Sequence, residues 1–187
     1  MTLEGNSTLN EGAAPMAVQQ LGNDTTTAYA DGQELVMERV FDAPRELVWK
    51  VMTDPSRISN WWGPRGYTTT VVEMDVRPGG KWRFINHTKD GEDVPFKGEY
   101  LEIEPPKRIV QTFIWDVPGF DDKAAVETLT LEDLGKRTRV VLRDRFPSVE
   151  DLEGAVSMGM IGGAIETWDR LAEEITRELT SRAASRG

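Results

Sequence analysis

The chain of 187 residues contains no cysteine and a single histidine, His87. Without thiols, disulfide bridges, thiolate catalysis and cysteine-ligated zinc are excluded. The domain must be held together by its core, which is compatible with the reducing conditions of the cytoplasm, where we expect the protein. His87 lies near a turn predicted at Asp90-Gly91, so we expect it to be exposed and not to be catalytic. We also expect no metal site and no cofactor.

Basic residues are also few, with 22 Lys and Arg against 32 Asp and Glu, which gives a net charge of −10. Binding to a phosphate backbone needs a dense positive surface that releases counterions, so we expect no nucleic-acid partner. Long apolar runs are missing as well, and no stretch approaches the roughly 18 apolar residues of a membrane span. The first residues lack the basic and apolar regions of a secretory signal.

Residues 1–32 are rich in Gly, Asn, Thr, Ala and Gln and have no sustained hydrophobic period. This composition predicts a disordered or loosely attached arm, with a partner-binding segment as the alternative. The pattern becomes periodic at Glu34, so we expect one domain over 33–180 and a flexible tail over 181–187.

The periodic part predicts an α+β fold. A strand over 35–41 stops before Pro44, and two short helices follow, of which the second begins at Pro55 and ends before Gly63. Six strand-like segments with short connections then predict an antiparallel meander. These segments cover residues 67–76, 81–88, 96–103, 108–116, 125–132 and 137–146.

A long helix is expected from Ser148, whose hydroxyl suits an N-cap, and its apolar stripe must face the sheet. Four glycines, Gly154, Gly159, Gly162 and Gly163, fall within it, and each costs up to about 1 kcal/mol relative to alanine. Two explanations are open: the helix approaches the sheet closely, or it is kinked in a way that gates a cavity.

Aromatic and apolar side chains that alternate on the strands or recur on the long helix point to a common interior. For each of them ordinary core packing is the alternative to contact with a ligand. Four charged strand residues, Arg83, Glu99, Arg143 and Arg145, are candidates for polar groups that would orient a ligand there. The expected cavity-lining residues are Trp61, Trp62, Trp82, Phe84, Tyr100, Phe113, Trp115, Met158, Ile161, Ile165 and Trp168.

Several short motifs, taken in order, resemble the activator-of-Hsp90-ATPase-like branch of the START/Bet v 1-like superfamily, also called SRPBCC or polyketide cyclase-like. The resemblance covers roughly residues 34–179. It implies a helix-grip fold, in which a curved antiparallel sheet surrounds a long C-terminal helix in the order β-α-α-β6-α, with a cavity between them. The motifs are Phe41-Asp42-Ala43-Pro44, Trp61-Trp62-Gly63-Pro64, Asp75-Val76-Arg77-Pro78-Gly79-Gly80, Gly98-Glu99-Tyr100 and Asp169-Arg170-Leu171.

Known relatives in this superfamily bind lipids, hormones, polyketides or other apolar molecules, and the resemblance implies the same kind of role here. We therefore expect a small hydrophobic, lipid- or polyketide-like ligand in the cavity, bound without catalysis. One alternative is an interaction module that stimulates the ATPase of the Hsp90 chaperone. A second is an enzyme of the polyketide cyclase or aromatase type. Both a monomer and a homodimer are compatible with the sequence.

Overall fold

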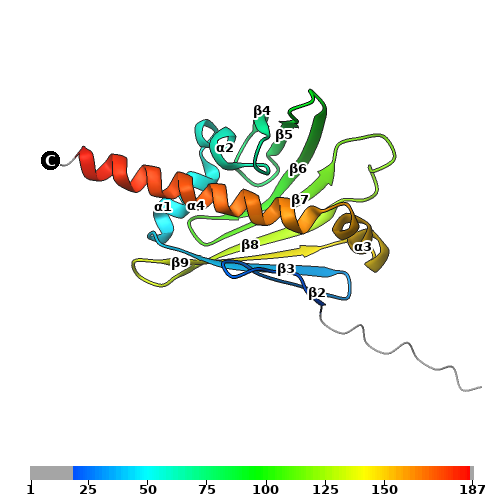
Figure 1. Cartoon of the computed structure of the whole chain (residues 1–187), viewed down its shortest axis with the longest axis horizontal. Helices are drawn as coiled ribbons and strands as arrows, with labels where there is room; N and C mark the ends of the chain where they lie inside the picture. The colour runs from blue at the N-terminus through cyan, green and yellow to red at the C-terminus, as the bar shows by residue number, and fades with distance from the viewer. Residues whose placement is uncertain (1–18, 186–187) are drawn as a thin grey trace, which may run out of the picture.

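One antiparallel sheet curves around a long helix in the computed structural model of the chain (Figure 1), which describes residues 19–185. Along the chain, the elements are β1 (Gln19–Gln20), β2 (Thr27–Asp31), β3 (Glu34–Phe41), α1 (Arg45–Thr53), α2 (Pro55–Trp61), β4 (Thr68–Met74), β5 (Lys81–His87), β6 (Asp93–Glu104), β7 (Arg108–Trp115), β8 (Ala125–Asp133), β9 (Thr138–Arg145), α3 (Val149–Ser157) and α4 (Met160–Ala184). Within the described residues the sheet has the order β1-β2-β3-β9-β8-β7-β6-β5-β4. The predicted helix-grip fold is confirmed.

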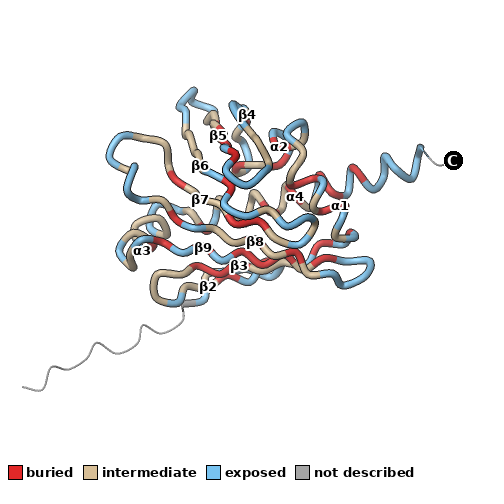
Figure 2. Tube along the Cα trace, turned by 180° about the vertical axis from the view of Figure 1, so that it is seen from behind, coloured by how far each residue is buried: buried red, intermediate tan, exposed pale blue. Residues whose placement is uncertain are grey.

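Alternation along the strands decides which face of the sheet is buried. In β5, Trp82, Phe84 and Asn86 are buried, and the residues between them are not. The registers of β4 with β5 and of β6 with β7 shift at bulges, which bend a sheet. Figure 2 shows the result: burial follows the middle strands, whereas the hairpin tips and the C-terminal end of α4 are exposed. The concave, buried face is the one that α4 crosses.

Ion pairs attach the short helix α2 to α4. Asp54 caps α2 by accepting a hydrogen bond from the Ser56 backbone N–H at 3.0 Å, and proline occupies the first turn. Nη1 of Arg57 donates to Oε1 of Glu174 at 3.1 Å, and Nη2 donates to Oε2 of Glu178 at 2.5 Å. Both glutamates are buried, so these bonds compensate carboxylates that have left water.

The expected long C-terminal helix is present as α4, but it does not begin at Ser148, because a separate short helix, α3, precedes it. Ser148 caps α3 as expected, its Oγ accepting from the Asp151 N–H at 3.1 Å. The break lies at Gly159, whose φ of +87° is a left-handed conformation that other residues adopt only with strain. At Gly154 and Gly162 a Cβ atom would meet nothing within 4 Å, so close approach to the sheet does not explain these two glycines.

The predicted boundaries of the arm and the tail also need correction. The arm was expected to reach Gly32, but β2 pairs with β3 along its whole length and Ala28 is fully buried. At the other end, α4 continues to Ala184, supported by Arg182, which donates to Glu178 at 2.9 Å. Residues 1–18 and 186–187 of the expected arm and tail lie outside the described residues.

Candidate functional site

A cavity of about 850 Å³ lies between the concave face of the sheet and the helices. Nine of the eleven residues predicted to line it do so, from α2, β5, β6, β7, the α3–α4 junction and α4. These are Trp61, Trp62, Trp82, Phe84, Tyr100, Phe113, Trp115, Met158 and Trp168. The other two, Ile161 and Ile165, pack in the hydrophobic core or against it and do not border the cavity.

The two consecutive tryptophans at the end of α2 have different surroundings. Trp61 is buried, and its Nε1–H donates to the carbonyl of Val51 in α1 at 3.2 Å. Trp62 lies among rings of the sheet, with its ring centroid 5.1 Å from that of Phe84 and 5.5 Å from that of Phe96. Trp61 therefore joins α2 to α1, whereas Trp62 extends the aromatic surface of the sheet.

Aromatic rings form a continuous wall of the cavity. Ring centroids of Trp82 and Phe113 are 5.5 Å apart, and those of Phe96 and Phe113 are 5.2 Å apart. Trp82 also lies 5.1 Å from Phe84 on the same strand. A wall of this kind binds apolar ligands by burying their surface and favours stacked or edge-on contact with other rings.

A row of polar side chains crosses the same inner face of the sheet. Tyr100, Gln111, Glu127 and Asp144 occupy paired positions on β6, β7, β8 and β9, and all four border the cavity. Because directly paired residues point to the same face of a sheet, they form a line across four strands. Nε2 of Gln111 donates a hydrogen bond to Oε1 of Glu127 at 2.7 Å.

The two carboxyl groups of this row are far from an ordinary aqueous environment. Burial together with the neighbouring Asp144 raises the pKa of Glu127 to about 8, and burial raises the pKa of Asp144 to about 7. Burial also raises the pKa of Tyr100, which stays a neutral phenol. At neutral pH the acid pair therefore retains a proton that exposed carboxyl groups would have lost.

The four charged residues proposed to orient a ligand are not part of the cavity lining. Each stands next in sequence to a residue that borders the cavity, and the strand alternation therefore turns it to the outer face. Nε of Arg83 donates to Asp116 at 2.8 Å, and Nη1 of Arg143 donates to Glu34 at 2.7 Å. The prediction was wrong by one residue in strand phase. The outward-facing residues are Arg83, Glu99, Arg143 and Arg145.

Sequence reasoning missed the polar row, although the pattern contained a signal for it. In β8 the side chains that face the cavity are those of Ala125, Glu127 and Leu129, and in β9 they are those of Leu142 and Asp144. An acid in the apolar phase of an alternating strand is costly unless it has a partner or a function. Such positions are the first place to search for polar groups in the interior of a sheet.

One end of the cavity is bordered by α3 and the connection between β7 and β8. Nζ of Lys123, from that connection, lies 2.9 Å from Oδ1 of Asp151 in α3. Met158 follows α3 and borders the cavity although 63% of its surface is exposed. The cavity therefore reaches solvent next to the break at Gly159.

His87 is half-exposed at the end of β5, in agreement with the expectation of a position close to a turn. Its Nε2 lies 2.8 Å from Oγ1 of Thr70, and its Nδ1 lies 2.6 Å from Oδ1 of Asp93. This arrangement has the order of a hydroxyl–imidazole–carboxylate triad, but none of the three residues borders the cavity. We assign it a role in joining β4, β5 and β6.

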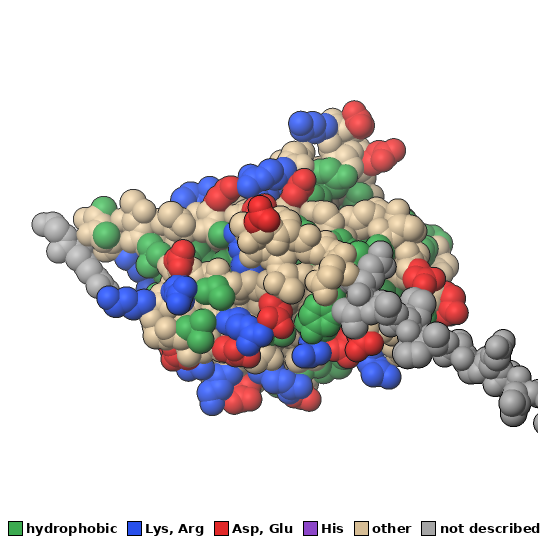
Figure 3. Space-filling model, turned by 60° about the horizontal axis from the view of Figure 1, so that its bottom comes forward, with side chains coloured by type: hydrophobic (Ala, Val, Ile, Leu, Met, Phe, Trp, Pro, Cys, Tyr) green, Lys and Arg blue, Asp and Glu red, His purple; other side chains and the backbone are tan. Residues whose placement is uncertain are grey.

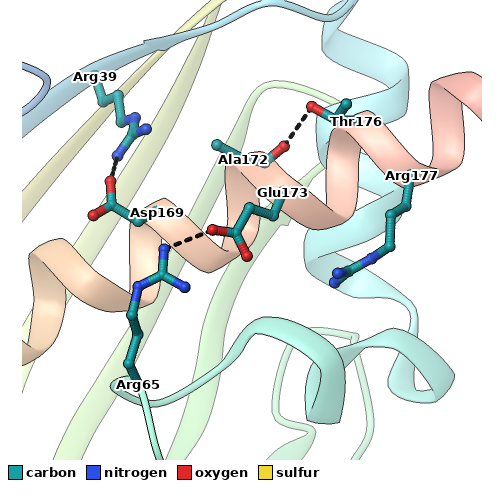
Figure 4. Close-up of a pocket in the computed structure, with 7 residues that line it drawn as sticks. All are labelled: Arg39, Arg65, Asp169, Ala172, Glu173, Thr176 and Arg177. Atoms are coloured by element: carbon teal, nitrogen blue, oxygen red, sulfur yellow. Dashed lines mark hydrogen bonds and ion pairs between the residues drawn. The ribbon is translucent and has the colours of Figure 1, made fainter.

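A second hollow, of about 470 Å³, lies on the α4 surface and is lined by charged groups (Figure 4). Arg39 of β3 points to Asp169, with 2.5 Å between Nη1 and Oδ1, and Arg65 reaches Glu173 with 2.6 Å between Nη2 and Oε1. These charges are already paired with one another, so the hollow offers a ligand little unsatisfied polarity.

Charges of both signs are interspersed on the face of the molecule shown in Figure 3, and no continuous basic stripe crosses it. Within residues 19–185 no three His, Asp or Glu side chains come together as a group that would hold a metal ion. In the same part of the chain no helix combines the length and the apolar character needed to span a bilayer.

Solved structures share this fold. A protein from Arthrobacter aurescens is 22% identical, with a TM-score of 0.74 over 88% of this chain and 93% of that one. A Rhodobacter sphaeroides protein is 21% identical, with a TM-score of 0.74 over 82% and 99% of the two chains. The AHSA1 protein from Silicibacter pomeroyi is 22% identical, with a TM-score of 0.64 over 78% and 99%.

No curated protein matches the chain. The resemblance read from the motifs is nevertheless confirmed, because the family model described as Activator of Hsp90 ATPase homolog 1-like protein matches residues 42–176. These residues run from the position after β3 far into α4 and include most of the residues that line the cavity. The protein belongs to this family.

Proposed function

We propose that the protein binds one small, largely apolar molecule in the cavity between the sheet and α4 and releases it unchanged. The observation that carries this proposal is the cavity itself, because about 850 Å³ lies within the range of about 300–1,000 Å³ typical of small-molecule sites. Its wall of aromatic rings supplies apolar contact area, and the polar row supplies the few groups that fix orientation. Family membership is consistent with this role and does not name the ligand.

A variant that fills the cavity tests the proposal. Ala164 of α4 borders the cavity, so Ala164→Phe would occupy ligand space, whereas Val126 lies on the exposed outer face of β8. We expect the wild type and Val126→Phe to bind 1-naphthylmethanol at one molecule per chain. The same titration with Ala164→Phe should show an affinity reduced about tenfold or more, since the lost contacts are worth at least 1.4 kcal/mol. Equal affinities in all three proteins would place the binding elsewhere and contradict the proposal.

A second candidate, an enzyme of the cyclase type, is favoured by the acid pair. Glu127 and Asp144 retain a proton near neutral pH, and a buried carboxyl group in that state can act as a general acid. The two candidates differ in what leaves the protein. Mass spectrometry of a bound molecule after release distinguishes them, because a carrier returns it with its mass and structure unchanged.

A further inference from the structure

The acid pair contains one of the buried side-chain atoms in residues 19–185 that lack a hydrogen-bond partner. Glu127 and Asp144 are direct cross-strand partners on β8 and β9 and both border the cavity. Glu127 accepts a hydrogen bond from Gln111, but Oδ1 of Asp144 is buried and has no hydrogen-bond partner among residues 19–185. Only 5% of the Asp144 surface is exposed. A buried acceptor without a donor is costly, and its position on the cavity wall allows a ligand to supply that donor.

No basic side chain within residues 19–185 forms an ion pair with Glu127 or Asp144. In the described part of the chain, Lys123 is the one basic residue that borders the cavity, and it is paired with Asp151 at the α3 end. The arginines next to Asp144 in β9 point to the outer face, as their sequence positions require. The titratable side chains that border the cavity are Tyr67, Tyr100, Lys123, Glu127, Asp144, Glu150 and Asp151.

The faces of the aromatic rings in the lining also suit a positive charge. Aromatic rings attract cations through the negative charge of their faces, by about 0.5–2 kcal/mol. Trp82 and Phe113 belong to the same inner face of the sheet as the acid pair. A carboxylate ligand group would instead meet two acids, and a neutral hydroxyl would donate one hydrogen bond without compensating charge.

We propose that the ligand is an apolar molecule with a protonated amine, whose N–H groups donate to the carboxyl groups of Asp144 and Glu127 while its apolar part lies against the aromatic wall. This inference rests on the proposed function, because it requires that the cavity be the binding site. It adds the chemical class of the ligand and the two residues that select it.

The proposal predicts how the affinity for an amine ligand changes with pH. Burial raises the pKa of Glu127 and Asp144, so in the protein without ligand these two carboxyl groups take up protons as the pH falls from 8 to 6. Protonation removes the negative charge that an ammonium group needs, whereas an alkylamine, like a lysine side chain, stays protonated over this range. Affinity for the amine should therefore fall by about fivefold or more between pH 8 and pH 6, and affinity for an uncharged analogue should stay constant.

Three probes that share one ring system and differ in charge provide the test: 1-naphthylmethylamine, 1-naphthylmethanol and 1-naphthoate. Isothermal titration at pH 8 should give the amine an affinity about tenfold or more above that of the alcohol, because a charge-assisted hydrogen bond replaces a neutral one. The naphthoate should bind most weakly. Asp144→Asn should reduce the preference for the amine over the alcohol to about twofold or less. Glu99→Gln, which removes an acid from the exposed outer face of β6, should leave the preference intact.

The outcomes separate the two proposals. If the alcohol binds and the amine binds no more tightly, the amine inference is overturned and apolar binding stands. If none of the three probes binds, the proposed function fails and the amine inference fails with it. Circular dichroism checks that Asp144→Asn is folded. If it is not folded, the pH series on the wild type decides, and an amine affinity that does not change between pH 6 and pH 8 overturns the inference.

Discussion

The buried carboxyl group of Asp144 has a cost in the empty protein, and Asp144→Asn should reveal this cost as a gain in stability at high pH. The amide has nearly the same shape as the carboxyl group and does not ionise. Asp144 is 5% exposed, and burial raises its pKa from 3.8 to about 7. A group whose pKa is higher in the folded state contributes stability below its unfolded pKa and loses that contribution as the pH rises to its folded pKa.

The magnitude follows from these two values. At 1.36 kcal/mol for each pKa unit, the difference between 3.8 and about 7 corresponds to about 4 kcal/mol lost from the wild type above pH 7. More than half of this loss falls between pH 5 and pH 8. The stability advantage of Asp144→Asn over the wild type should increase by about that amount over the same interval.

Urea unfolding followed by tryptophan fluorescence at pH 5 and pH 8 measures the effect. The difference between variant and wild type is the relevant quantity, because titrating groups distant from Asp144 contribute equally to both proteins. Glu127 is the exception: loss of the Asp144 charge lowers its pKa, which adds to the gain in stability of the variant at high pH. Glu99→Gln should show no comparable change in its difference from the wild type. An Asp144→Asn protein that gains no stability relative to the wild type between pH 5 and pH 8 would refute the conclusion that this carboxyl group is buried without a partner.

Two further predictions concern the scaffold. Arg57→Gln should destabilise the fold by about 2 kcal/mol in urea unfolding, because buried Glu174 keeps only part of its compensation. Arg65→Gln, which removes an exposed ion pair, should cost clearly less, and equal costs would contradict the role of the buried pairs. Gly98→Ala should lower the melting temperature sharply, since its Cβ would lie 1.9 Å from a β7 backbone carbonyl, and Gly154→Ala, with nothing within 4 Å, should leave it unchanged or raise it; a tolerated Gly98→Ala would show that β6 and β7 can separate locally.

Much of the fold was readable from the sequence because its strands alternate and its turns contain glycine or proline. The segments predicted over 81–88 and 108–116 agree with β5 and β7 within a residue at each end. β2 was missed because the inward side chains of this strand, Ala28 and Ala30, are small and give a weak hydrophobic pattern. Its place in the sheet comes from pairing with β3, a contact that a local pattern does not reveal.

The candidate site was predicted in its apolar part and missed in its polar part. Large aromatic residues such as Trp82 and Phe84 are expected to be buried because of their apolar surface, so their position in the interior is predictable from residue type. Whether a polar side chain faces the cavity depends on the strand phase alone. An error of one residue in that phase assigns Arg143 or Arg145 to the cavity instead of Asp144. The α3–α4 break likewise depends on the backbone conformation of one residue among four similar glycines, Gly159.

Native mass spectrometry of the protein, purified gently from the organism that encodes it, tests the central claim most directly. The account predicts one small molecule per chain, released on denaturation and largely apolar, with a basic nitrogen if the acid pair selects it. A protein that carries no such molecule, and that gains no thermal stability from any member of a panel of lipids, polyketides and aromatic amines, would contradict the account and direct attention to a protein partner such as Hsp90.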